Sequence, residues 1–576
     1  MNLSPLTRQD RLSHASITAA RLLSARTFFP LAFCCLAFVF VVYRQSLDFQ
    51  FVLDDHRFTA DPRIQESGHI WDYFANFVWA QFTGGQPSFY RPVFLLWMRI
   101  NFVLSALSPW GWHLLSIGKH VLVAALLGML ALKLLRDSTV TLVAATLFAL
   151  HPAQTESVSW VTVPDPLMAA GVLIALLCYF RYLEGFSNKE PVHRKKPRKS
   201  STADLINRQG KWLAASVAAY FVALLAKETA IVFPVVILAL NLRSTPRQMA
   251  LQDRSRADGG NSGRWTQALR QTLPFIAVTG MYLVLRLGAL GGMGAATQHL
   301  PWSTVVLSWP AILWFYLRVL LWPRKSYSFA DPILIEKFSA REVLLPLLGL
   351  ACAVVILAAL LFWAWRRAQR ELEGRAAGGV ESAIIVGTLL LVLPLLPALN
   401  LNALNPGDFL HGRYTYLPLV GLMLLMAAGW RMTKLPRIVL LCVACALTIA
   451  FAALTFGQEK QWKDDATVFG IAHELAPNNV PVARHLADTR VQTALLLDEE
   501  GRCSEATPIF EQVIREFPQD WYAWAGLGDC YAQLNDLVKA EESLHRAADI
   551  SHNPRVTAHW QELRIHMGLS SSAPAN

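Results

Sequence analysis

Long runs of apolar residues recur along this chain up to Phe456, with short polar loops between them. A run of about 20 such residues is long enough to cross the hydrocarbon core of a bilayer as a helix. Of the 576 residues, 54% are hydrophobic and 16% are charged, which lies outside the usual balance of soluble globular domains. The sequence therefore predicts an all-α fold built on a polytopic membrane helix bundle.

The apolar runs predict about eleven crossings. The first run, residues 28–43, is expected to be an uncleaved anchor, because no cleavage site of small residues follows it. Residues 92–107 include Arg99 and Asn101 and could lie in the interface. One run, residues 305–322 or a neighbour, must be re-entrant or interfacial if the basic loops are to share one side. The other predicted crossings are residues 110–135, 140–150, 167–182, 212–226, 231–242, 273–290, 343–365, 383–399, 416–430 and 438–456.

Lysine and arginine concentrate in the loops at residues 185–211 and 243–264, and in the polar residues 1–26 before the first run. Basic loops are retained on the cytoplasmic side of a membrane. The net charge of +11 is therefore expected to reflect topology, and nucleic-acid binding is not expected. This orientation puts the loop at residues 46–91 and the C-terminal part outside. The predicted location is a bacterial inner membrane, with that loop on the periplasmic side.

The chain changes character near residue 458, where charged residues become frequent and long apolar runs end. We expect a membrane domain at residues 27–457, a helical-repeat domain at 458–568 and a disordered tail at 569–576. Residues 521–554 span one period of 34 positions, the length of a tetratricopeptide repeat. Such repeats stack to leave a concave face that can hold a peptide, although a helical cap on the membrane domain would look similar. The pattern positions are Trp524, Leu527, Gly528, Tyr531, Ala540 and Ala547.

Six of the eight cysteines lie in apolar runs, where a thiol behaves as a small hydrophobe. Cys442 and Cys445 have a C-x-x-C spacing, but no second pair accompanies them, so packing is the expected role. Cys503 and Cys530 belong to the C-terminal part. If that part lies in an oxidising compartment, these two could form a disulfide, and the sequence leaves open whether they do.

Two adjacent carboxylates, Asp54 and Asp55, follow soon after the first apolar run. The run holds them just outside the membrane face. There, a carboxylate can take a proton from an incoming hydroxyl while a lipid-borne reactant arrives from the bilayer. A solvated pair in an ordinary loop is the competing interpretation, because surface carboxylates usually have no such role.

Further ionisable residues gather on the same predicted face. Such residues at membrane depth cost several kcal/mol and tend to be paired or functional. Each has a plain alternative: Lys227 and Glu228 could neutralise each other, His151 could end a helix, and Arg413 could anchor its span at the interface. Their convergence on one side nevertheless favours a shared site. The candidates besides the two aspartates are Arg91, His113, His151, Glu156, Asp165, Lys227, Glu228, Arg413 and Tyr414.

Recognisable motifs surround these clusters in a fixed order. They are Phe-Val-Leu-Asp-Asp at 51–55, Tyr-Arg-Pro at 90–92, Trp-Gly-Trp-His-Leu at 110–114, His-Pro-Ala-Gln-Thr-Glu-Ser-Val-Ser-Trp at 151–160, Ala-Lys-Glu-Thr at 226–229, Arg-Tyr-Thr-Tyr-Leu-Pro at 413–418, Trp-Lys-Asp at 462–464 and Pro-Asn-Asn at 477–479. In this order and spacing the chain resembles the transmembrane and tetratricopeptide-repeat-containing O-mannosyltransferases and their bacterial relatives. Those enzymes belong to the C-superfamily (GT-C) of integral-membrane glycosyltransferases.

The resemblance implies transfer of one sugar, with mannose the first expectation, from a polyprenyl-phosphate carrier to a hydroxyl acceptor of a protein. One of Asp54 and Asp55 would be the general base, and the other would position it or the acceptor. Lys227, Arg413 and Arg91 would meet the carrier phosphate, because cations that stabilise a departing phosphate accelerate its loss. A single displacement at the anomeric carbon would invert its configuration. No cofactor is required, and a divalent metal is not expected but stays open.

Two positions depart from the pattern of those relatives. They usually carry a basic residue immediately before the acid that matches Asp165, where this chain has Pro164. That departure puts the role of this loop in donor binding, and with it the identity of the sugar, in doubt. An acidic residue that often precedes the Arg-Tyr pair is replaced by Gly412.

Two other functions compete with this one. A glycosyltransferase of the same architecture could modify a lipid or a cell-envelope glycan, with the repeats recruiting partners. A non-catalytic scaffold or a transporter would belong to a different class. A transporter is expected to show broken or polar helices at mid-membrane, whereas the polar residues here lie mainly at the ends of the runs. A scaffold would tolerate loss of Asp54 and Asp55, whereas an enzyme would not.

Overall fold

The computed structural model describes residues 23–82, 89–187, 202–252, 260–292, 299–323, 334–370, 379–404, 410–433 and 435–569. The expected N-terminal segment and C-terminal tail fall largely outside these ranges, as do large parts of the two basic loops. Within them all regular structure is helical, as predicted. The chain divides into two compact units, and the main boundary in the sequence lies between Lys463 and Asp464. We call them the membrane unit and the soluble unit.

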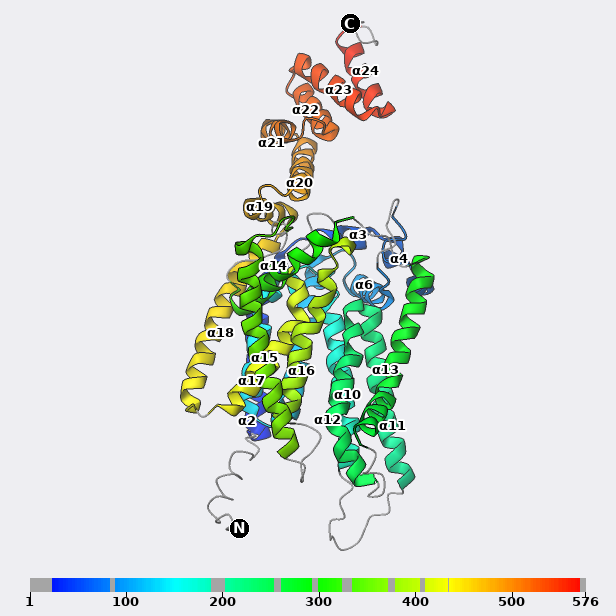
Figure 1. Ribbon diagram of the computed structural model, residues 1–576. Helices are drawn as coiled ribbons and strands as arrows, with labels where there is room; N and C mark the ends of the chain where they lie inside the picture. The colour runs from blue at the N-terminus through cyan, green and yellow to red at the C-terminus, as the bar shows by residue number, and fades with distance from the viewer. Residues whose placement is uncertain are drawn as a thin grey trace, which may run out of the picture. The chain divides into compact units, whose positions relative to one another are not determined.

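The membrane unit consists of long helices that lie side by side, with the short helices α3, α4 and α6 at one end (Figure 1). We call this end the loop end. Its helices are α2 (Ala25–Tyr43), α3 (Asp54–Ala60), α4 (Pro62–Gln65), α5 (Ile70–Ala75), α6 (Pro92–Ser105), α7 (Pro109–Leu135), α8 (Ser138–Ala149), α9 (Thr155–Ser159), α10 (Asp165–Ser187), α11 (Thr202–Ala226), α12 (Phe233–Gln252), α13 (Gly260–Leu290), α14 (Trp302–Leu321), α15 (Leu345–Arg370), α16 (Val380–Val392), α17 (Tyr416–Met432) and α18 (Arg437–Glu459). Short 3-10 turns include η2 (Pro152–Gln154), η3 (Glu228–Val232) and η7 (Gly412–Thr415).

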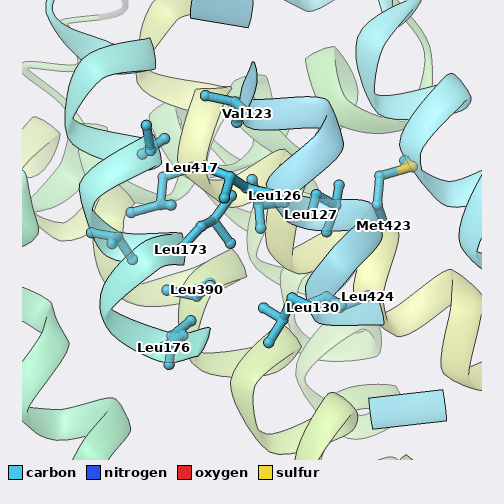
Figure 2. Packing of buried hydrophobic residues seen from close by; sticks show 14 of the residues in the cluster. Val123, Leu126, Leu127, Leu130, Leu173, Leu176, Leu390, Leu417, Met423 and Leu424 are labelled. Atoms are coloured by element: carbon cyan, nitrogen blue, oxygen red, sulfur yellow. The ribbon is translucent and has the colours of Figure 1, made fainter. Parts of the chain in front are cut away.

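Four helices, α7, α10, α16 and α17, form the centre of the bundle, because most of their apolar residues are buried. Helices α13, α15 and α18 instead leave most of their apolar side chains exposed, as expected for helices in contact with lipid. In lipid the helices associate through close packing, because lipid tails are as apolar as leucine. The central contacts in Figure 2 join Val123, Leu126, Leu127 and Leu130 of α7, Leu173 and Leu176 of α10, Leu390 of α16, and Leu417, Met423 and Leu424 of α17.

Two glycines allow α16 and α17 to approach closely. A Cβ atom added at Gly421 would lie 2.4 Å from the backbone nitrogen of Leu391 and 2.5 Å from the carbonyl oxygen of Gly387. A Cβ at Gly387 would lie 2.9 Å from the Gly421 carbonyl oxygen. Small residues at such crossings are typical of membrane helix pairs, because they let the two backbones touch.

Ten helices of the described residues are long and apolar enough to cross a membrane, and α14 is one of them. However, α14 begins and ends at the loop end. Leu300 before it donates its N–H to Asn402, and its Leu320 carbonyl accepts from His151. This is the re-entrant or interfacial course that the sequence led us to expect for one of the runs. The shorter α8 and the more polar α12 do connect the two ends, which leaves eleven connecting helices among the described residues.

Ion pairs at the opposite end hold neighbouring helices together. Arg243 of α12 pairs with Glu381 at the start of α16, at 3.3 Å. Arg437 at the start of α18 pairs at 3.1 Å with Asp137, whose side chain also caps α8. These arginines are therefore at the end that the charge pattern assigns to the cytoplasm.

The soluble unit is a series of helix pairs, as the repeat pattern predicts. Its helices are α19 (Asp465–Leu475), α20 (Val480–Glu499), α21 (Cys503–Glu516), α22 (Trp521–Gln533), α23 (Leu537–Ser551) and α24 (Pro554–His566). Asn479, Asp520 and Asp536 each accept a backbone N–H at the start of a helix, which satisfies a donor that would otherwise have no partner. At the core, a Cβ added at Gly526 would lie 2.4 Å from Phe510, so large and small residues interlock there.

Candidate active site

The polar loops of the membrane unit meet around one stretch of chain, residues 156–165, which we call the central segment. It includes most of α9 and ends at the first residue of α10. Side chains from α3, α7 and α18, and from the residues immediately before η3 and η7, contact this segment or its ends. Much of the described polar network at the loop end therefore depends on how the central segment is folded.

Asp55 is fully buried and tied to the central segment. Its Oδ1 accepts a hydrogen bond from the Thr162 hydroxyl at 2.6 Å and another from the Thr162 N–H at 3.1 Å. Its Oδ2 accepts from the Val52 N–H at 3.1 Å. Burial raises the pKa of Asp55 to about 7, although the bonds from Thr162 and Val52 act in the opposite direction. This carboxyl group therefore titrates near neutral pH.

Asp54 differs from Asp55 in its surroundings. Both residues belong to the first turn of α3, but Asp54 is only partly buried. Leu53 immediately before it has φ = 55°, a backbone conformation that is rare for any residue except glycine. Strained backbone of this kind is concentrated at functional sites, where the surrounding structure enforces it. The structure thus gives the two aspartates different environments: one is held by three donors and the other is accessible.

Asp165 and Lys227 form a buried ion pair. The ammonium group lies 2.7 and 2.6 Å from the two carboxylate oxygens. Asp165 starts α10, and Lys227 precedes η3 at the turn between α11 and α12. Burial lowers the pKa of Lys227, and the neighbouring Asp165 opposes that change. The pair fixes the end of the central segment against a different part of the bundle.

Arg91 and Glu228 form a second, bidentate pair. Arg91 Nε lies 2.9 Å from Glu228 Oε2, and Nη2 lies 2.6 Å from Oε1. Burial alone would raise the pKa of Glu228, but the charge and hydrogen bonds of Arg91 outweigh it and lower this pKa to about 2. Glu228 is therefore ionised at any physiological pH. The two parallel hydrogen bonds also fix the orientation of the Arg91 guanidinium group. This group lies 4.1 Å from the centre of the Phe89 ring.

Glu156 connects the central segment to η7. Its Oε1 lies 2.9 Å from His411 Nδ1, and its Oε2 accepts the backbone N–H of Arg413 at 3.2 Å. The Arg413 guanidinium lies 4.4 Å from the centre of the Trp160 ring. A Cβ atom at Gly412 would lie 3.1 Å from Glu156 Oε2. This crowding is a physical reason for glycine at the position where relatives often carry an acid.

The ring of Tyr414 brings the cationic groups together. Lys227 Nζ lies 5.2 Å from its centre, and the Arg413 guanidinium carbon lies 5.6 Å away. The His411 ring packs edge-on against it at 5.4 Å between centroids. Arg91 also lies close enough to Lys227 to act on its charge. The predicted residues Arg91, Lys227, Arg413 and Tyr414 thus belong to one cluster.

His113 and His151 do not join this network through the bonds that the structure shows. His151 Nε2 lies 3.1 Å from the Leu320 carbonyl oxygen, and its Nδ1 accepts the Ala153 N–H. Burial lowers the pKa of His151 to about 4, so the ring is neutral near pH 7. His113 is buried on α7, edge-on to Phe49 at 6.1 Å between centroids. These bonds of His151 agree with the alternative role considered for it from the sequence, which was to end a helix.

Several residues of the site were not predicted from the sequence. Lys119 is buried on α7, where its ammonium donates to the Val161 carbonyl at 3.4 Å and lies near both Asp55 and Asp165. A lysine inside a predicted membrane crossing was a signal for it, since such residues are rarely without a role. Thr162 and Trp160 carry no such signal, because hydroxyl and indole groups are common in loops. Glu459 accepts from Gln45 at 2.9 Å and from Ser159 at 3.3 Å.

Groups of potential metal ligands are rare in the described residues. Three or more ligand atoms within 4.8 Å of one another occur only at Asp498, Cys503 and Cys530, in the soluble unit. Lysine, arginine, histidine and backbone or hydroxyl donors instead hold the carboxylates of Asp55, Glu156, Asp165 and Glu228. A metal-independent reaction at the loop end stays a prediction.

The comparisons with known proteins agree with the motifs. A family model described as tetratricopeptide repeat matches residues 499–563. Protein O-mannosyl-transferase Tmtc1 of Drosophila melanogaster is 26% identical over 518 residues, which cover 77% of this chain and 57% of the relative. Human protein O-mannosyl-transferase TMTC3 is 24% identical over 519 residues, which cover 88% of this chain and 54% of that protein. The resemblance predicted from the motifs is confirmed, and this chain spans about half the length of these curated relatives.

Two solved structures also match this chain. The oligosaccharyltransferase of Archaeoglobus fulgidus is 12% identical, with a TM-score of 0.39 over 80% of this chain and 60% of that one. ArnT from Cupriavidus metallidurans is 14% identical, with a TM-score of 0.35 over 88% of this chain and 76% of that one.

Proposed function

We propose that this chain is an inverting glycosyltransferase that moves a single sugar, with mannose the first candidate, from a polyprenyl-phosphate carrier to a protein hydroxyl group. One observation carries the proposal: Asp55 is buried and bound to Thr162, while the same central segment carries cationic groups at both ends. Acid–base and phosphate-binding groups are thereby held in one polar site at the loop end. The names of the relatives support the same activity.

In this proposal Asp54 is the general base and Asp55 positions it. A base must reach the proton of the acceptor hydroxyl, and Asp54 is the more accessible of the two. Asp55 is fully buried and already accepts three hydrogen bonds, so its carboxylate faces protein donors. By holding α3 against Thr162, it fixes the turn on which Asp54 stands.

The donor phosphate would bind at the cationic cluster. Arg413, stacked on Trp160, keeps 18% of its side chain exposed, and Arg91 keeps 13%, whereas Lys227 is more deeply buried. Lys119 adds a further buried positive charge that no carboxylate within 4 Å neutralises in the described residues. As the bond from the anomeric carbon to the phosphate oxygen breaks, its electron pair stays with the phosphate. These cations would stabilise the charge that develops there.

The reaction balances with protein groups alone. The acceptor oxygen attacks the anomeric carbon from the side opposite the phosphate, and its proton passes to Asp54. The lipid phosphate leaves as the new glycosidic bond forms, so the configuration inverts. Because the donor is already activated, the protein supplies a base, charge stabilisation and orientation in a site with little water.

An apolar groove between α11 and α13 suits the carrier chain. It is lined only by apolar side chains and glycine, and it has a volume of about 440 Å³. On α11 the lining extends from Phe221 back to Gly210. At 1.5 Å per residue this lies roughly 9 to 26 Å along the helix from Lys227. A lipid whose phosphate binds near Lys227 could place its first prenyl units there.

The active face is proposed to be external, on the periplasmic side of a bacterial inner membrane. The described basic residues Lys133, Arg136, Arg243 and Arg437 lie at the end opposite to the site, which agrees with a cytoplasmic location for that end. The soluble unit is proposed to hold the acceptor polypeptide on its repeat face.

Transfer from radiolabelled polyprenyl-phosphate mannose to acceptor peptides tests this proposal, with the purified full chain in detergent. We expect label in the peptide, in the anomeric configuration opposite to that of the donor, as read by configuration-specific mannosidases. Retained configuration would contradict single displacement. Label in lipid or glycan fractions only would favour the envelope-glycan alternative, and no transfer with several donors would favour the scaffold.

A further inference from the structure

Two buried cysteines and one carboxylate converge in the soluble unit. The thiols of Cys503 and Cys530 lie 3.1 and 3.2 Å from the same atom, Oδ1 of Asp498. The Gln533 side-chain amide also lies 2.7 Å from this oxygen. Both cysteines are free thiols in the structure, so the disulfide considered from sequence is not formed here.

Local backbone geometry explains why these residues meet. Asp498 is in the last turn of α20, Cys503 is the first residue of α21, and Cys530 is in the last turn of α22. Gly501 has φ = 74° and makes the tight turn between α20 and α21. Its N–H donates to the Asp498 carbonyl at 2.9 Å. The turn thus brings Asp498, at the end of α20, close to Cys503, at the start of α21.

The three ligand atoms are spaced as in a tetrahedral metal site. All lie within 4.8 Å of one another. With Zn–S near 2.3 Å and Zn–O near 2.0 Å, neighbouring ligand atoms of a tetrahedral zinc site are roughly 3.5 Å apart. The observed sulfur-to-oxygen distances of 3.1 and 3.2 Å need to open by only a few tenths of an ångström. Two thiolates with one carboxylate are ligands that zinc accepts.

We propose that Asp498, Cys503 and Cys530 bind a thiophilic divalent cation of the zinc class, with water or the Gln533 amide oxygen as the fourth ligand. Binding releases the two thiol protons, so the metal and two thiolates replace two S–H groups. The edge of the site is open, because Asp498 is only partly buried. The carboxylate of Asp529, which lies 3.5 Å from His559, is close enough to act electrostatically on Cys503. The cation would cross-link α20, α21 and α22, because each of these helices provides one ligand.

Cobalt titration of the purified full chain, reduced and freed of metal with a chelator, tests this site. We expect about one Co²⁺ per chain with a near-ultraviolet thiolate-to-cobalt absorption band. Cys503→Ser and Cys530→Ser should each abolish the band, and Asp498→Asn should weaken binding at least about tenfold. Cys442→Ser removes an exposed cysteine of α18 and serves as the matched control. Circular dichroism checks that each variant is folded.

Three results would overturn the proposal. The wild-type chain could bind no Co²⁺ with a thiolate band, or Cys503→Ser and Cys530→Ser could bind it as well as wild type. Alternatively, peptide mass spectrometry of chain isolated without reductant could find Cys503 and Cys530 joined in a disulfide throughout. None of these results depends on glycosyl transfer, so failure of the metal-site proposal is distinguishable from failure of the proposed activity.

Discussion

Replacing Thr162 with valine should shift the pH dependence of sugar transfer. The Thr162 hydroxyl donates a 2.6 Å hydrogen bond to Asp55 and thereby lowers the pKa of that carboxyl group, which burial raises to about 7. Valine has a similar shape but no hydroxyl, and the backbone N–H of this position remains. The Thr162→Val variant therefore removes one of the three bonds that favour the charged form of Asp55.

The size of the shift follows from the strength of that bond. A hydrogen bond to a charged group contributes about 1.5–3 kcal/mol. At 1.36 kcal/mol per pKa unit, its loss would raise the pKa of Asp55 by about 1–2 units. The charged form accepts all three donors, whereas protonation puts a hydrogen where an acceptor is needed. Transfer should thus fall as pH drops through about 7 in the wild type, and through about 8–9 in Thr162→Val.

The assay is the initial rate of mannose transfer from the polyprenyl-phosphate donor by the purified chain. It is measured from pH 5.5 to 10, which covers the expected fall in rate of both the wild type and Thr162→Val. Thr162→Ser retains the hydroxyl and is the control, with an acid limb close to that of the wild type. Identical profiles for Thr162→Val and wild type would refute the reasoning. So would a Thr162→Ser profile displaced as far as that of Thr162→Val.

Further predictions concern the ion pairs and the repeat core. Arg91→Met leaves the partly buried Glu228 without its ion-pair partner and should destabilise the membrane unit by up to about 3 kcal/mol, more than Arg91→Met/Glu228→Gln does, in detergent unfolding measurements. If the double variant is the less stable one, the pair is not the cause. Lys227→Met should raise the KM for the lipid donor more than it changes the KM for the acceptor, in steady-state kinetics. Gly526→Val would clash with Phe510 and should destabilise the soluble unit by about 1–3 kcal/mol, as read by limited proteolysis. Gly470→Ala, where a Cβ meets open space, should leave proteolysis unchanged or slower.

The helical architecture was predictable because it follows from the lengths of the apolar runs. The sequence also predicted that residues 305–322 or a neighbouring run would not cross the membrane, because the basic loops can share one side only if one run stays on one side. Helix α14, residues 302–321, is that run. Repeat packing was predictable at Gly528 and Ala540, because their alternation with large residues has a fixed period. The structure bears this out, since a Cβ at Gly528 would lie 2.6 Å from Leu544 and 3.2 Å from the Ala540 carbonyl.

The pairing within the site could not be predicted from sequence. Asp165 and Lys227 are 62 positions apart, and Glu156 and His411 are 255 apart, so only the packed fold brings them together. Sequence marks an ionisable residue near a membrane as costly, but it does not say which partner offsets that cost. Thr162 was missed for the same reason: its hydroxyl becomes significant only when a buried carboxylate lies 2.6 Å away.

The most direct test of the account is the rate of sugar transfer by Asp54→Asn at pH 8, compared with wild type and Asp72→Asn at matched protein levels. Asp72 lies in the same loop, residues 46–91, and pairs with His69 on the surface, so its variant controls for loss of a loop carboxylate. Removing a general base should slow transfer by about 10²–10⁴-fold without changing the melting temperature. Asp72→Asn should match wild type. Transfer by Asp54→Asn at the wild-type rate would contradict the assignment of the base and, with it, the proposed active site.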